Sequence, residues 1–142
     1  MKRTAEITLS IIGSVLYLIG ALFGGIFRMF EGNEELREEI MNDPQVQQTD
    51  IGDVQLILDT MGSFGTVIVV SSIIAIVVGI VASILFKGNN KPVIASILLL
   101  VTSVVIIFIT YGLGIFAGIF FIIAGIMGLA RKPKQEVNME QY

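Results

Sequence analysis

The stretch from Pro92 to Ala130 reads PVIASILLLVTSVVIIFITYGLGIFAGIFFIIAGIMGLA and contains no charged or histidine side chain. An α-helix rises about 1.5 Å per residue, so about 20 apolar residues cross a hydrocarbon core of ~30 Å. This stretch is therefore long enough to cross a membrane twice. The segment Tyr111-Gly112-Leu113-Gly114 supplies its only turn chemistry, and we expect two antiparallel spans, at about 92–110 and 115–130, joined by a tight turn.

Two further apolar runs lie upstream, at about 7–27 and 64–86. Hydrophobic residues make up 54% of the chain, and the mean hydropathy is +0.87, which is outside the range of ordinary soluble domains. We therefore expect a single all-α membrane domain over residues 1–142. Its fold would be a four-transmembrane-helix bundle with a short helical outer loop between spans 1 and 2, at about 31–62, and a tail at 131–142.

Basic residues flank these four spans unequally. On the side of the two termini lie Lys2, Arg3, Lys87, Lys91, Arg131, Lys132 and Lys134, and on the other side only Arg28 and Arg37. Because Lys and Arg are enriched on the cytoplasmic side of membrane proteins, we predict a plasma-membrane protein with both termini and the tail in the cytoplasm. Glu6 lies one turn from Lys2 and Arg3, and we expect an interfacial ion pair there.

The outer loop is the one sizeable hydrophilic segment, and its pattern predicts two short helices. Asn33 can cap the first, and Thr49 or Asp50 can cap the second. We expect these helices to lie on the membrane surface or to cap the bundle. The functional alternative is a partner-binding surface made of the acidic side chains Glu34, Glu35, Glu38, Glu39, Asp43, Asp50 and Asp53. Cation binding by the three aspartates is a weaker alternative, because their spacing differs from that of a calcium loop.

Small and hydroxyl-bearing residues recur at helical spacing within the spans. They are Gly13, Gly20, Gly24, Gly79, Ser96, Ser103, Thr110, Gly114, Gly118 and Gly125. In lipid, such residues allow helix backbones to approach closely. We interpret them as helix-packing positions within one bundle. Homo-oligomerisation through one of these faces and a hydroxyl-lined pore are the alternatives.

The sequence lacks the residue types that several kinds of chemistry require. The chain has no Cys and no His, so thiolate nucleophiles, disulfides, imidazole catalysis and the common zinc sites are excluded. No Asp, Glu, Lys or Arg lies in the middle of a predicted span, whereas proton relays and coupled transporters need such residues. We therefore expect no enzyme activity, no catalytic residue, no cofactor and no metal. No soluble basic domain is present for nucleic acid.

Four parts of the chain resemble one family. They are similar to small four-span membrane proteins of unknown function from Gram-positive bacteria. These parts are the start Lys2-Arg3-Thr4-Ala5-Glu6, the loop sequence Asn42-Asp43-Pro44, the turn Lys87-Gly88-Asn89-Asn90-Lys91-Pro92 and the ending from Ile123 to Lys132. The resemblance implies a bacterial plasma membrane and four spans, and it brings no catalytic residues.

These observations together favour a non-enzymatic, multi-pass membrane accessory or scaffold protein of a larger envelope or transport complex. Its partners would be the lipid bilayer and another membrane protein. The alternative is a subunit of a small oligomeric channel or transporter.

Overall fold

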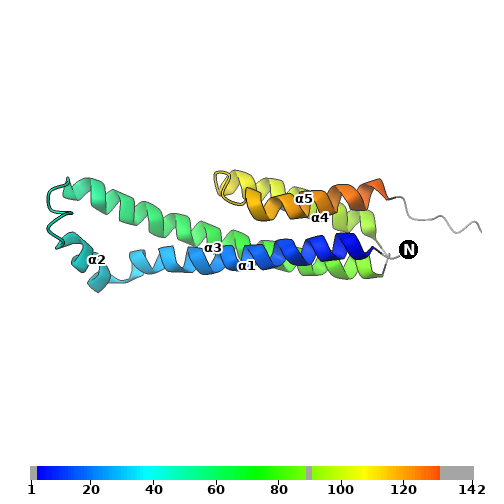
Figure 1. The fold of residues 1–142 in the computed structure, drawn as a ribbon, viewed down its shortest axis with the longest axis horizontal. Helices are drawn as coiled ribbons and strands as arrows, with labels where there is room; N and C mark the ends of the chain where they lie inside the picture. The colour runs from blue at the N-terminus through cyan, green and yellow to red at the C-terminus, as the bar shows by residue number, and fades with distance from the viewer. Residues whose placement is uncertain (1–2, 89–90, 132–142) are drawn as a thin grey trace, which may run out of the picture.

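The computed structural model describes residues 3–88 and 91–131, and these residues form five α-helices without a strand. The helices are α1 (Thr4–Gly32), α2 (Glu34–Met41), α3 (Ile51–Lys87), α4 (Pro92–Ile109) and α5 (Ile115–Ala130) (Figure 1). By length and composition, α1, α3 and α4 can each cross a membrane, and α5 is a shorter apolar helix of 16 residues. The chain is thus a helical membrane protein.

Helices α1 and α3 form a long antiparallel pair, and the α4–α5 hairpin packs against one end of it (Figure 1). The ring of Tyr111, in the turn of the hairpin, lies 6.2 Å from that of Phe64 on α3, between centroids. Beyond this level, α1 and α3 continue without the hairpin. We call this part the two-helix extension. It consists of Gly25–Gly32, α2, the connection after α2 and residues 51–63 of α3.

The core lies where all four long helices meet. Its buried residues are Tyr17, Ala75, Ala82, Phe86, Ala95, Leu99, Ile106, Ala117, Phe121 and Ala124. Alanines occupy several of the helix contacts, because helices in lipid are held together by close van der Waals packing. Most large hydrophobic side chains instead point outward, including Leu22, Ile84 and Phe108. This inside-out distribution is what a hydrocarbon environment requires.

Two local predictions are confirmed by the backbone. Helix α2 begins after Asn33, whose side-chain oxygen accepts a hydrogen bond from the Leu36 N–H at 3.2 Å. The turn of the hairpin falls at the predicted place, since Tyr111 and Gly112 have positive φ angles of 51° and 91°. Both features depend on residues that are neighbours in the sequence.

The prediction of a separate second short helix is wrong. Asp50 caps a helix as expected, accepting from the Gly52 N–H at 3.0 Å, but that helix continues unbroken through the predicted second span to Lys87. No proline interrupts the segment. The glycines Gly62 and Gly65, each of which weakens a helix by about 1 kcal/mol, lie where α1 packs against α3. Close contact with α1 offsets their low helix propensity. Helix α1 likewise extends beyond its predicted span at both ends.

Candidate functional site

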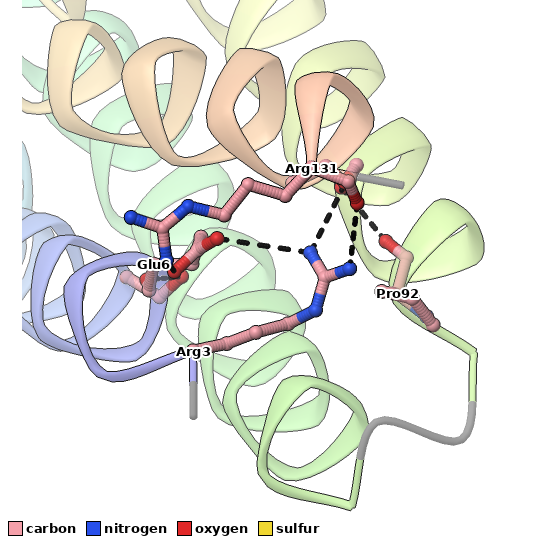
Figure 2. Close-up of polar contacts among 7 residues, drawn as sticks. Arg3, Glu6, Pro92 and Arg131 are labelled. Atoms are coloured by element: carbon pink, nitrogen blue, oxygen red, sulfur yellow. Dashed lines mark hydrogen bonds and ion pairs between the residues drawn. The ribbon is translucent and has the colours of Figure 1, made fainter. Parts of the chain in front are cut away.

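A buried cluster of charges lies where the first turn of α1 meets the end of α5. Figure 2 shows Arg3, Glu6 and Arg131 pointing toward one another. The Glu6 side chain is fully buried, and its two carboxylate oxygens lie 3.7 Å from Arg3 Nη1 and 3.4 Å from Arg131 Nη1. The predicted pair with Arg3 therefore exists, and it is buried within the bundle. Lys2, the other predicted partner, lies outside the described residues.

Arg3 also binds the last turn of α5. Its guanidinium donates to the carbonyl of Gly128 at 3.2 Å and to that of Arg131 at 2.7 Å. The final carbonyls of a helix have no partner within the helix and carry partial negative charge, so a cation satisfies them well. The cluster thus joins the beginning of α1 to the end of α5. The contact between Glu6 and Arg131 is not predictable from sequence spacing, because 125 positions separate the two residues.

A cavity of about 390 Å³ lies among α1, α3, α4 and α5. Its lining is mostly apolar, with hydroxyls from Tyr17, Ser71, Ser72 and Thr110. Ser71 and Thr110 donate to carbonyls of their own helices at 2.7 Å. The buried Tyr17 hydroxyl has no hydrogen-bond partner among the described residues. No carboxylate or amine lines this cavity in the described part of the chain, so the polar groups on its walls are hydroxyls.

The predicted packing glycines of α1 and α3 lie at helix contacts, with one exception. A Cβ atom built at Gly13 would lie 2.5 Å from the Phe121 ring, and one at Gly24 would lie 2.9 Å from the Gly65 carbonyl oxygen. A Cβ at Gly79 would collide with the Ser14 hydroxyl. Gly20 differs, because it is partly exposed and its nearest neighbour would be Ser72 Oγ at 3.6 Å.

The predicted packing residues of α4 and α5 contact one another within the hairpin. A Cβ at Gly114 would lie 3.0 Å from Thr110 Oγ1, one at Gly118 would lie 3.0 Å from Ile107 Cδ1, and one at Gly125 would lie 3.0 Å from the Ser96 carbonyl oxygen.

The three predicted packing residues that carry hydroxyl groups face the interior of the bundle. Ser96, Ser103 and Thr110 are buried, and they donate to the carbonyls of Pro92, Leu100 and Ile106 respectively. Each hydroxyl is therefore satisfied by its own helix.

The acidic residues of the predicted partner surface are all exposed and all lie on the two-helix extension. They are Glu34, Glu35, Glu38, Glu39, Asp43, Asp50 and Asp53. Within residues 3–88 and 91–131, no three Asp or Glu side chains come together in a way that could hold a metal ion. Asp43 and Asp50 instead accept from the backbone N–H groups of Gln45 and Gly52.

One ion pair fixes α2 against α3. Arg37 Nη2 lies 2.6 Å from Asp59 Oδ1, and this pair is partly exposed. Four of the exposed acidic side chains, Glu34, Glu35, Glu38 and Glu39, lie on α2, which this pair joins to α3.

A family model described as "Protein of unknown function (DUF4064)" matches residues 2–110 of the chain. No curated protein and no solved structure matches it.

Proposed function

We propose a role for this chain, which belongs to the DUF4064 family of proteins of unknown function. It is a non-enzymatic accessory or scaffold protein of a larger membrane complex. The observation that supports this most is the two-helix extension. It projects past the α4–α5 hairpin (Figure 1). It also displays the exposed acidic side chains, whereas the rest of the surface is largely aliphatic. A partner with a basic surface would be complementary to it.

The topology that we propose has four spans in a bacterial plasma membrane. Helix α5, at ~1.5 Å per residue, is about 24 Å long, and it packs antiparallel to α4. If α5 crosses the membrane, four described basic residues lie together on the cytoplasmic side, namely Arg3, Lys87, Lys91 and Arg131. The acidic extension would then face the outside, where an envelope or transport protein could bind it.

The experiment is affinity purification in mild detergent from the native host. The variant changes Glu34, Glu35, Glu38 and Glu39 to Gln together. We expect the amount of copurified partner to fall by at least about tenfold, because like-signed neighbours act together in electrostatic recognition. The thermal unfolding midpoint should stay unchanged, because exposed carboxylates contribute little to stability.

A matched control changes the uncharged exposed residues Gln45, Gln47 and Gln48 of the same extension to Ala, and it should retain the partner. Equal recovery of the partner with the Gln variant and the unchanged protein would contradict an acidic docking surface. Passage of ions or solutes through proteoliposomes containing the pure protein, lost on Ser103→Val, would replace the scaffold with the oligomeric channel.

A further inference from the structure

A groove of about 660 Å³ runs between α1 and α3, and its described lining residues all come from these two helices. The floor is low because Gly79 has no side chain and Ser14 and Ser83 have short ones. The walls are built from long aliphatic side chains, such as Ile11 of α1 and Ile80 of α3. The groove therefore arises from small residues in the middle and branched residues on both sides.

The groove opens toward the lipid and offers only apolar contacts along its length. Ile11 and Ile80 are both exposed on its walls. The hydroxyls on its floor already form hydrogen bonds within their own helices. Ser14 donates to the Ser10 carbonyl and Ser83 donates to the Gly79 carbonyl, each at 2.8 Å. An occupant thus gains van der Waals contact and needs no hydrogen-bonding groups in this part. A hydrocarbon chain meets that requirement.

The length of the groove matches one leaflet of a bilayer. On α1 it extends from Ile7 to Leu18, about 16 Å at ~1.5 Å per residue. Half of a ~30 Å hydrocarbon core is about 15 Å. On the antiparallel α3 it extends from Lys87 to Ile76, so Lys87 lies at the Ile7 end. With the charged Lys87 at a membrane surface, the other end of the groove reaches the region of the midplane.

A positively charged side chain, that of Lys87, lies at the surface end of this groove. Lys87 is exposed, and its ammonium forms no ion pair with any residue in 3–88 or 91–131. The buried carboxylate at this end of the bundle, that of Glu6, is already held by Arg3 and Arg131. An anionic headgroup at the membrane surface would supply the counter-charge that the protein itself does not. Lysines in such positions attract anionic lipids.

We propose that the α1–α3 groove binds one anionic phospholipid of the leaflet on the Lys87 side. One acyl chain lies along the groove from Lys87 toward the midplane, and the headgroup phosphate lies beside the Lys87 ammonium. The inference requires that the chain is a membrane protein. It does not depend on the scaffold role or on the direction of insertion.

The test uses fluorescence quenching by brominated lipids. The chain contains no Trp, so a single introduced Trp is the only indole that emits. The reporter in the groove is Ile80→Trp, and its control on the lipid-facing side of α4 is Ile97→Trp. These isoleucines are 53% and 49% exposed. Ile80 lies about two turns from the surface end of α3, and Ile97 lies about one and a half turns from that of α4. The protein is reconstituted in vesicles that mix phosphatidylcholine with phosphatidylglycerol, with one of the two brominated.

We expect Ile80→Trp to report about fivefold preference for phosphatidylglycerol over phosphatidylcholine, the factor that one lysine near the membrane surface contributes. Ile97→Trp should report no preference. Lys87→Gln should abolish the preference at Ile80→Trp, whereas Lys91→Gln should leave it intact, because Lys91 is exposed nearby but does not line the groove. Both lysine variants lose one charge, so general attraction to the vesicle falls equally.

Three results would overturn the proposal. One is equal preference at the two reporters, and another is a preference that survives Lys87→Gln. The third is a groove filled by a second copy of the chain. In that case no brominated lipid quenches the fluorescence of Ile80→Trp, and Val15→Cys forms disulfide-linked dimers. Quenching of Ile97→Trp by brominated phosphatidylcholine shows that α4 of this control variant is in contact with lipid, and each variant's thermal unfolding midpoint is compared with that of the unchanged protein.

Discussion

Two adjacent glycines of α1 differ sharply in their surroundings. A Cβ atom at Gly24 would lie 2.9 Å from the Gly65 carbonyl oxygen on α3, whereas one at Gly25 would meet nothing within 4 Å. Gly24→Ala should therefore lower the free energy of unfolding by about 1–3 kcal/mol through overpacking. Gly25→Ala should be neutral or stabilising by up to about 1 kcal/mol, because Ala favours the helix. Thermal unfolding in detergent compares the two, and equal midpoints would show that α1 and α3 do not pack at Gly24.

The two kinds of ion pair in this chain should also differ in their effect on stability. Glu6→Gln removes the charge that Arg3 and Arg131 share in a buried site, and the loss should be about 3–5 kcal/mol. Asp59→Asn breaks the partly exposed pair with Arg37 and should cost less than about 1 kcal/mol. Denaturant titration in mixed micelles measures both. A loss for Glu6→Gln no larger than that for Asp59→Asn would mean that the cluster is hydrated.

At the scale of the element, α3 is longer than a membrane is thick. Its 37 residues extend about 55 Å at ~1.5 Å per residue, compared with a hydrocarbon core of ~30 Å. Gln55→Cys, on the two-helix extension, should react with a water-soluble maleimide in opened membranes. Val77→Cys, which is equally exposed on the protein but faces lipid, should not react. Modification of both positions at similar rates would place residue 77 in water and contradict the assignment of the span.

At the scale of the whole molecule, the proposed topology can be read from which side of the membrane each segment faces. In this chain without native Cys, Asp43→Cys should react with an impermeant maleimide on intact cells, whereas Gly88→Cys should react only after lysis. A reporter fused after Tyr142 should be cytoplasmic if α5 crosses the membrane. An outward-facing reporter would reduce the number of spans to three, and labelling of position 88 from outside would reverse the orientation.

The sequence by itself determined the features that depend on composition or on near neighbours. The uncharged stretch from Pro92 to Ala130 indicated a membrane protein and a hairpin, and the turn at 111–114 and the cap at Asn33 lie where they were predicted. Apolar length, positive φ and capping are properties of a few consecutive residues, and the physical chemistry that fixes them acts locally.

Only the tertiary structure decided which of these residues meet. It joined Glu6 to Arg131, merged the predicted second outer helix into α3, and left Gly20 open although it lies on the same small-residue stripe as Gly24. It also placed Lys87 at the end of an apolar groove whose walls come from two helices. The physical reason is that a stripe of small residues permits close approach without specifying the partner. The partner, and with it every cavity and groove, is set by the packing of whole helices.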